Sequence, residues 1–225
     1  MSLYDRGMLE VLKAIGEATR LRIVAVLRRG ELTVTDLTEI LGQSQPRVSR
    51  HLKLLVDAGV VAKHREGAWA FFRLVDDVAT RTLVDAALDP IDDDDVLAAD
   101  RRRLDVVRAR RADAARAYFE EIAPVWDEER SLHADAATVE AAVVDALDDR
   151  PLGRVLDLGT GTGRMIQLLA ERAEHCVGLD SSHSMLAVAR ANLERAGVED
   201  WELRQGDAYS PPFEAATFDL VVIHQ

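Results

Sequence analysis

The stretch Arg154-Val155-Leu156-Asp157-Leu158-Gly159-Thr160-Gly161-Thr162-Gly163 decides the fold of the second half of this 225-residue chain. Its first five residues predict a buried strand, its glycines predict a tight turn, and residues 164–172 predict a helix. Glycine lets a backbone adopt left-handed angles and approach a ligand closely. The stretch therefore predicts a strand–turn–helix unit whose turn can bind a ligand.

The residues after the glycine turn continue this alternation. Three more strands are expected at 176–180, 201–205 and 218–223, and a helix is expected at 184–196. Strands that alternate with helices predict a parallel, doubly wound sheet, which binds its ligand at the carboxyl ends of the strands. The sequence ends at Gln225, so we expect a sheet truncated after its fourth strand.

The spacing of the glycines separates several kinds of nucleotide-binding loop. A dinucleotide loop has the pattern G-x-G-x-x-G, whereas here Arg164 takes the place of its last glycine. No Gly-Lys-Ser/Thr sequence follows, which excludes a phosphate loop. The pattern resembles motif I of the class I S-adenosylmethionine-dependent methyltransferases, which have a Rossmann-like sheet. The resemblance implies S-adenosylmethionine or S-adenosylhomocysteine as the cofactor.

The residues that the resemblance assigns to the cofactor lie in the glycine turn or at the carboxyl ends of expected strands. They are Asp157, Gly159, Gly161, Gly163, Asp180, Asp207 and Ala208. In this family Asp157 would lie near the methionine end, Asp180 would accept the ribose hydroxyls, and Asp207 would meet the adenine amine. The catalytic residues stay unknown, because methyl transfer from a sulfonium needs proximity and alignment rather than a base.

The first third of the chain has the opposite charge. Residues 1–75 carry 12 Lys and Arg against 8 Asp and Glu, a net charge of +4, and the rest of the chain carries −16. A basic segment attached to an acidic body is typical of a nucleic-acid reader. Apolar residues recur at helical spacing over 9–15 and 21–27, which predicts two helices.

A helical pair and a hairpin are expected next. A short helix spans 36–41, and a longer helix begins after Ser44 and ends at Gly59. Two strand-like runs, 60–65 and 68–74, are joined by Glu66-Gly67 and predict a hairpin. Two helices joined by a tight turn can place the second helix in a DNA major groove.

Polar and basic residues of the longer helix lie mostly opposite its apolar side, and the hairpin adds further cations. The candidate DNA-binding residues are Gln45, Arg47, Ser49, Arg50 and Lys53 on the helix, and Lys63 and Arg65 on the hairpin. Arg47 and Arg50 can donate to guanine edges, and the hairpin cations suit phosphates. The alternative is that these side chains are merely solvated. His51 is open between a base contact and a buried, hydrogen-bonded role.

Residues 12–23 (LKAIGEATRLRI) and 44–55 (SQPRVSRHLKLL) resemble ArsR-type winged helix-turn-helix repressors. The resemblance covers roughly residues 8–75. It implies a homodimer that binds an inverted repeat of double-stranded DNA and leaves it when an effector binds. Residues 31–37 lack the cysteines, and residues 78–88 the histidines, of the metal-sensing members, so no metal site is expected.

Other features bound the environment of the protein. The single cysteine, Cys176, cannot form an intrachain disulfide and fits a reducing cytoplasm. No run of about 18 apolar residues occurs, so no membrane partner is expected. The expected organisation is an α/β multi-domain protein: a winged-helix domain over 1–90, an acidic and helical connector over 91–132, and a methyltransferase-like domain over 133–225.

These features favour a transcriptional regulator, a repressor by its resemblance, whose second domain binds S-adenosylmethionine or S-adenosylhomocysteine as a small-molecule effector. The alternative is a methyltransferase that acts on a small molecule and carries an appended winged helix. A third possibility is a degenerate α/β domain that serves only for dimerisation.

Overall fold

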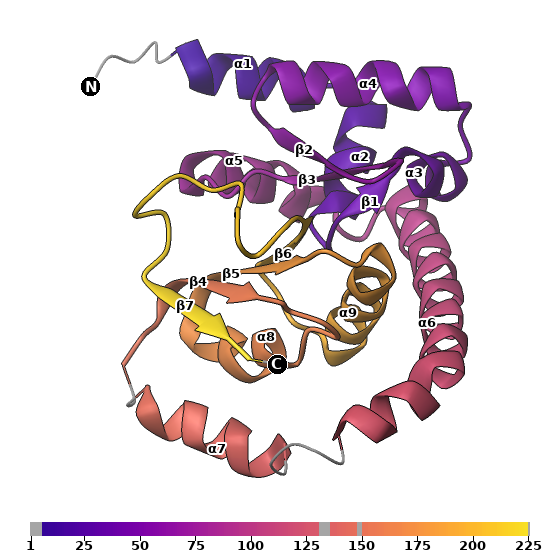
Figure 1. Ribbon diagram of the computed structural model, residues 1–225. Coiled ribbons are helices and arrows are strands. Elements are labelled where there is room, and N and C mark those ends of the chain that lie inside the picture. Colours follow the sequence, from indigo (N-terminus) through magenta and orange to yellow (C-terminus); the bar gives the residue numbers. More distant parts are fainter. Residues whose placement is uncertain (1–5, 131–135, 148–149, 225) are drawn as a thin grey trace. The chain divides into compact units, whose positions relative to one another are not determined.

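In the computed structural model the chain divides into two compact units, Met1–Val107 and Arg108–Gln225 (Figure 1). The structure describes residues 6–130, 136–147 and 150–224, with side chains described for 7–118, 138–147 and 150–224. The division falls within the long helix α6 (Asp95–Arg130), inside the segment expected as a connector. No helix in the described part of the chain has the length and apolar character needed to span a bilayer.

The first unit is a winged helix-turn-helix, as expected. Its three-stranded antiparallel sheet has the order β1-β3-β2. Its elements are α1 (Arg6–Ile15), α2 (Ala18–Leu27), β1 (Leu32–Thr33), α3 (Val34–Leu41), α4 (Gln45–Asp57), β2 (Val61–Glu66), β3 (Trp69–Leu74), α5 (Val78–Leu88), η1 (Asp89–Ile91) and the first part of α6.

Local sequence signals set the bounds of the helical pair. Thr33 and Asp36 form a capping box at the start of α3, and Gly42 ends that helix in a left-handed conformation. Ser44 occupies the cap position of α4, but its side chain makes no capping hydrogen bond, and Pro46 lies in the first turn. The two helices are therefore joined by a turn that needs a glycine.

The hairpin turn lies one residue later than expected. Glu66 is the last residue of β2 and pairs with Trp69, so the turn is formed by Gly67 and Ala68. The side chain of Glu66 is fully buried, which explains why it belongs to the strand rather than to the turn.

The second unit has the expected parallel sheet, in the order β6-β5-β4-β7. Its elements, besides the second part of α6, are α7 (Ala136–Ala146), β4 (Gly153–Leu158), α8 (Arg164–Leu169), η2 (Ala170–Arg172), β5 (Ala173–Asp180), α9 (His183–Ala196), β6 (Trp201–Gln205) and β7 (Leu220–Ile223). The glycine turn joins β4 to α8, at the carboxyl end of a central strand.

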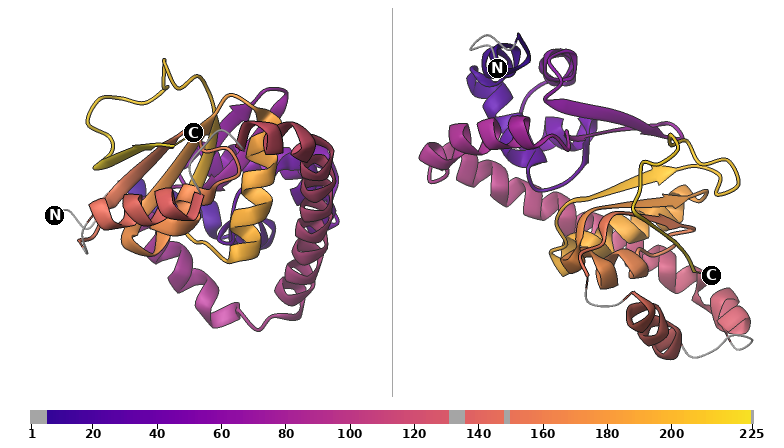
Figure 2. Two further views of the ribbon diagram at one scale, coloured as in Figure 1. Left: turned by 60° about the horizontal axis from the view of Figure 1, so that its bottom comes forward. Right: turned by 90° about the vertical axis from the view of Figure 1, so that its left-hand side faces the viewer.

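The two faces of this sheet are covered differently. Helices α8 and α9 lie on one face (Figure 2), where Val155, Ile166 and Leu186 are buried. Cys176 belongs to this core, and burial, with a smaller effect from the charge of Asp157, raises the pKa of its thiol to about 12. On the other face, Phe213 and Phe218 from the connection between β6 and β7 pack against apolar side chains of β4 and β5.

Candidate cofactor site and nucleic-acid interface

The sheet order brings the three candidate carboxylates to neighbouring strand ends. Strands β6, β5 and β4 are adjacent and parallel, and Asp207, Asp180 and Asp157 lie at or just beyond their carboxyl ends. His224 follows β7, which pairs with β4 on its other side. This edge of the sheet therefore brings together the three carboxylates that the methyltransferase resemblance assigns to the cofactor.

Asp157 is the buried carboxylate of this edge. Its residue is 2% exposed, and its Oδ2 accepts a hydrogen bond from Thr160 Oγ1 at 2.7 Å. Burial raises the pKa of Asp157 to about 6, against the opposing effects of the Thr160 hydrogen bond and of His224, and Asp180 raises the pKa further. Because burial disfavours the charged form of this carboxylate, a cationic ligand beside it would stabilise that form.

Asp180 fixes the glycine turn to the end of β5. Its Oδ2 accepts the Gly161 N–H at 2.9 Å, and its Oδ1 accepts the Ser182 N–H at 2.8 Å. The N–H groups of Gly159 and Thr160 both donate to the carbonyl of Leu179, at 2.8 and 3.0 Å. The turn is thus held in place by the neighbouring strand.

The three glycines of the turn have left-handed backbones but different surroundings. A Cβ at Gly159 would meet nothing within 4 Å, and one at Gly161 only the Gly159 carbonyl oxygen at 3.9 Å. A Cβ at Gly163 would lie 3.2 Å from Ala189 Cβ of α9. Gly159 and Gly161 therefore border open space, whereas Gly163 allows α8 and α9 to pack closely.

These features fit a ligand that carries ammonium and hydroxyl groups and no phosphate. Open space above two glycines allows close approach, and carboxylates rather than backbone N–H groups border that space. At the far end, Asp207 and Ala208 are exposed, and Asp207 Oδ1 accepts the Tyr209 N–H at 2.9 Å.

Two residues that support this site, Gly178 and Thr160, were not identified from the sequence. Gly178 is the register partner of Asp157, and a Cβ there would lie 2.8 Å from Thr160 Oγ1 and 2.9 Å from Ile166 Cδ1. Gly178 therefore makes room for the Asp157–Thr160 hydrogen bond. An isolated glycine within a strand was the available signal, because it indicates close approach of another group.

The candidate DNA-binding residues lie on two exposed surfaces of the first unit. On α4 the five candidates Gln45, Arg47, Ser49, Arg50 and Lys53 are exposed, whereas Val48, Leu52 and Leu55 are buried. On β2, Lys63 and Arg65 are exposed. Lys53 Nζ lies 2.6 Å from Asp57 Oδ2, so one candidate forms an ion pair along its own helix.

His51 is half-buried and faces the start of α2, so it does not belong to this exposed face. Its side chain is 14% exposed, and its Nδ1 lies 3.4 Å from Glu17 Oε2. Glu17 in turn caps α2 by accepting the N–H groups of Thr19 and Arg20, at 3.0 and 3.1 Å. His51 therefore lies between α4 and the start of α2, and its Nδ1 makes no hydrogen bond there.

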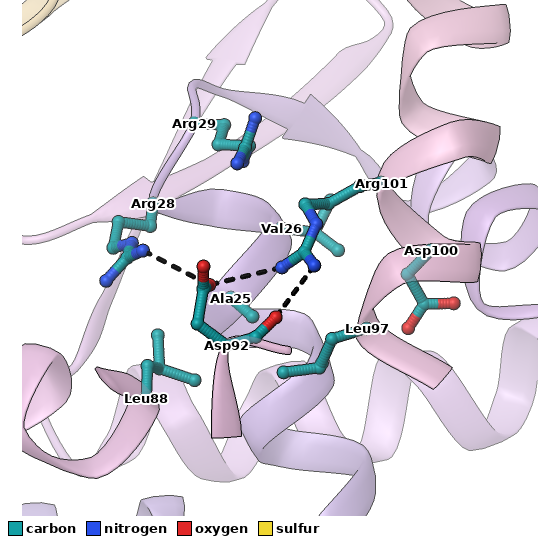
Figure 3. Close-up of a pocket in the computed structure, with 9 residues that line it drawn as sticks. All are labelled: Ala25, Val26, Arg28, Arg29, Leu88, Asp92, Leu97, Asp100 and Arg101. Atoms are coloured by element: carbon teal, nitrogen blue, oxygen red, sulfur yellow. Dashed lines mark hydrogen bonds and ion pairs between the residues drawn. The ribbon is translucent and has the colours of Figure 1, made fainter. Parts of the chain in front are cut away.

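A small pocket of the first unit is lined by ion pairs (Figure 3). Asp92 Oδ1 lies 3.1 Å from Arg101 Nη1 and 3.6 Å from Arg28 Nη2, and its carbonyl accepts from Arg101 Nη2 at 2.7 Å. The pocket has room for about one water molecule. We interpret it as a structural contact among α2, η1 and α6.

Residues 17–63 match the bacterial regulatory protein arsR family, and residues 155–225 match a methyltransferase domain. The chain is 38% identical over 78 residues to the uncharacterized HTH-type transcriptional regulator MJ1325 of Methanocaldococcus jannaschii, covering 34% of this chain and 86% of that protein. It is 42% identical over 110 residues to demethylmenaquinone methyltransferase of Thermus thermophilus, covering 47% and 49%.

Among solved structures, the homodimeric winged helix-turn-helix domain Mb0332 of Mycobacterium bovis, a possible ArsR-family regulator, is similar at 25% identity. The match covers 40% of this chain and 82% of the Mb0332 chain, with a TM-score of 0.36.

The fold and the comparisons define a DNA-binding regulator joined to a methyltransferase domain. The chain belongs to the ArsR family of transcriptional regulators through its first unit. Its second unit is a methyltransferase domain, a class that binds cofactors of the S-adenosylmethionine type. The chain spans about half the length of the methyltransferase that it matches over 110 residues.

Proposed function

We propose that this protein is a repressor whose methyltransferase domain binds S-adenosylmethionine or S-adenosylhomocysteine as an effector that tunes DNA affinity. The observation that carries the proposal is the sheet edge with Gly159 and Gly161 beside open space and Asp157 buried at its base. Because this edge belongs to the same chain as a DNA-binding domain, a ligand bound there would act as a signal for that domain.

The DNA-binding part of the proposal rests on the exposed face of α4. Arg47 and Arg50 would donate to guanine edges and Gln45 to adenine, while Lys63 and Arg65 would contact phosphates. Three large apolar side chains of α1 are exposed, Met8 at 51%, Leu9 at 47% and Leu12 at 44%. Their exposure supports a homodimer, which would read the two halves of an inverted repeat.

The cofactor part assigns each end of the ligand to one strand end. Asp157, Gly159 and Gly161 would surround the amino-acid end of the ligand. Asp180 already accepts two backbone N–H groups, and the remaining lone pairs of its carboxylate would accept the ribose hydroxyls. Asp207 and Ala208 would meet the adenine. Gly163 would contribute by holding α8 against α9 rather than by touching the ligand.

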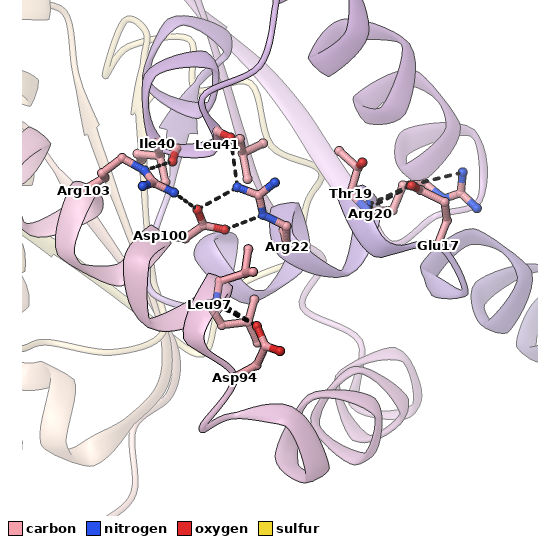
Figure 4. A network of polar contacts seen from close by, with 11 residues as sticks. Glu17, Thr19, Arg20, Arg22, Ile40, Leu41, Asp94, Leu97, Asp100 and Arg103 are labelled. Carbon is pink, nitrogen blue, oxygen red and sulfur yellow. Dashed lines mark hydrogen bonds and ion pairs between the residues drawn. The ribbon is translucent and has the colours of Figure 1, made fainter.

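Helix α6 is the element through which the two functions would be coupled. In the first unit, its Asp100 pairs with Arg22 of α2, and its Arg103 donates to the carbonyl of Ile40 in α3 (Figure 4). In the second unit, Arg108 and Arg111 of the same helix lie 3.8 and 3.4 Å from Glu194 of α9. Because α9 begins three residues after Asp180, ligand binding at that carboxylate would act on a helix bonded to α6.

The test is fluorescence anisotropy of the full-length protein on its own promoter DNA, titrated separately with S-adenosylhomocysteine and S-adenosylmethionine. Calorimetry with each ligand establishes binding independently. We expect at least about a fivefold change in the DNA dissociation constant, the lower end of typical coupling energies. Ligand binding without any change in DNA affinity would overturn the effector role.

A second candidate function is a methyltransferase that acts on a small molecule. The 42% identity to demethylmenaquinone methyltransferase over 110 residues favours it. It predicts that S-adenosylmethionine is converted to S-adenosylhomocysteine only when an acceptor is added, which mass spectrometry can follow. Failure of both ligands to bind would favour a domain that serves only for dimerisation.

A further inference from the structure

The wing of the first unit contains a buried cluster of three ionisable residues that the functions above do not use. The side chains of Glu31 and His64 are 1% exposed, and that of Glu66 is 0% exposed. Charged side chains are rarely buried to this degree unless they are paired or bind a metal. The cluster therefore needs a physical explanation of its own.

The strand pattern explains why these residues meet. His64 and Glu66 are two residues apart on β2, so both point to the same, inner face of the sheet. Glu31 immediately precedes β1, which pairs with the other edge of β3. The cluster thus connects β2 to the chain that leads into the helical pair.

His64 is the member whose hydrogen bonding is incomplete. Neither of its ring nitrogens makes a hydrogen bond, although both are buried. Its Nε2 lies 3.5 Å from Glu31 Oε2 and 3.5 Å from Glu66 Oε1. Its ring stacks on Phe71, with centroids 5.6 Å apart and planes 13° from parallel, which holds the ring in this orientation. Buried polar groups normally have a hydrogen-bond partner. The imidazole of His64 has none, and its Nε2 faces two carboxylates, so a cation between the three groups would satisfy it.

We propose that Glu31, His64 and Glu66 bind a divalent cation of the zinc class inside the wing. One atom from each residue can be chosen so that all three lie within 4.8 Å of one another. Ligands of a tetrahedral ion at 2.0–2.1 Å are about 3.4 Å apart, close to the two measured distances of 3.5 Å. One imidazole nitrogen and two carboxylate oxygens suit zinc better than magnesium or calcium, which prefer oxygen alone.

The expectation of no metal site came from the absence of cysteines at 31–37 and of histidines at 78–88. The proposed site uses other positions: one residue before β1 and two on β2. Lys63 and Arg65 alternate with its ligands on β2 and face outward. A bound cation would therefore stiffen the strand that carries the proposed phosphate contacts.

The test uses full-length protein that has been treated with a chelator and desalted. Titration with Co²⁺ should saturate at one equivalent per chain with the visible bands of a low-symmetry site, and Zn²⁺ should displace it. His64→Gln and Glu66→Gln should each weaken Zn²⁺ binding at least about tenfold. His51→Gln is the matched control, because His51 is also near a glutamate but has no second one, and it should bind normally.

Two results would overturn the proposal. One is the absence of saturable binding at one equivalent by wild-type protein, which would make the cluster an internal polar contact among the three side chains. The other is unchanged binding in a folded His64→Gln variant. If that variant fails to fold, X-ray absorption of the zinc-loaded wild type decides, because it must show one imidazole ligand. None of these results depends on whether the second unit binds a cofactor.

Discussion

The guanidinium of Arg22 in α2 donates two hydrogen bonds to the carboxylate of Asp100 in α6. Arg22 Nε lies 2.6 Å from Asp100 Oδ2, and Arg22 Nη2 lies 2.8 Å from Asp100 Oδ1. The Asp100 side chain is 1% exposed, and Arg103 donates to the same carboxylate. The hydrogen bond to Asp100 raises the pKa of Arg22, so the guanidinium keeps its charge.

Replacing Asp100 by Asn should destabilise the first unit by about 3–5 kcal/mol, because Arg22 and Arg103 would lose the buried charge that they share. Urea unfolding followed by circular dichroism measures this. The matched control is Arg116→Ala on the same helix, whose pair with Asp113 is exposed and should contribute at most about 1 kcal/mol. An Asp100→Asn effect no larger than the control effect would show that the pair does not hold α6.

Substitutions on α4 and on β2 should weaken DNA binding in different ways. Arg50→Ala should cost about 1–3 kcal/mol and relax the preference for the operator over unrelated DNA, because a base contact is lost. Arg65→Ala should weaken binding to all sequences alike and lower the salt slope by about 1, because a phosphate contact is lost.

Anisotropy titrations at several salt concentrations, on operator and on scrambled duplexes, separate these two effects. Arg195→Ala, an exposed residue at the end of α9, should change neither. If Arg50→Ala weakened binding to both duplexes equally, Arg50 would be a phosphate contact and not a base reader.

Gly159→Ala should reduce S-adenosylhomocysteine affinity because a methyl group would occupy the open space beside the turn. It should also cost about 1–2 kcal/mol of stability, since its φ of +74° is unfavourable for alanine. Gly197→Ala is the matched control: Gly197 has a φ of +67° and open surroundings, but it ends α9 away from the turn.

Calorimetry with the ligand and thermal unfolding of both variants distinguish strain from steric exclusion. We expect both variants to lose similar amounts of stability. Only Gly159→Ala should also lose affinity for the ligand. Equal affinities in the two variants would place the ligand elsewhere.

The raised pKa of Asp157 should make the second unit lose stability as the pH rises. Between the usual aspartate value of 3.8 and about 6, the unfolded chain has released the proton while the folded chain retains it. Stability therefore falls with increasing pH through this window, by on the order of 3 kcal/mol in total. Asp157→Asn should remove this contribution.

The measurement is the difference in unfolding free energy between wild type and Asp157→Asn at pH values from 4 to 7. Carboxylates with lowered pKa values, such as Asp77 and Glu140, produce the opposite trend but are common to both proteins. A difference that is constant across this range would show that Asp157 titrates in the folded protein as it does in water.

The sequence predicted the order and type of most elements, though not of the two-residue strand β1, because their signals are local. Gly42 is an example, since the expected helix over 36–41 does end at this left-handed glycine, a signal that acts within one turn of the chain. The sheet edge was also predictable, because parallel pairing brings the carboxyl ends of neighbouring strands to one edge. The positions of Asp157 and Asp180 follow from this alone.

Contacts between distant parts of the chain could not be predicted in the same way. The Arg22–Asp100 pair joins residues 78 positions apart, and Arg22 has many acidic candidates in so charged a sequence. The partners of His64 were hidden for a similar reason, because they depend on the register of β2 against β3 and on where Glu31 enters the sheet. Packing, rather than local preference, decides both.

Cys176 has a practical consequence. A thiol that has a pKa of about 12 and belongs to a residue 1% exposed hardly reacts with maleimides at neutral pH, because the thiolate is the nucleophile. Cysteines introduced at exposed Ser49 and Tyr209 would therefore accept fluorescent dyes selectively, without removal of the native residue. Energy transfer between the two dyes would then report, on single molecules, how the distance from the DNA-reading helix to the sheet edge responds to each ligand.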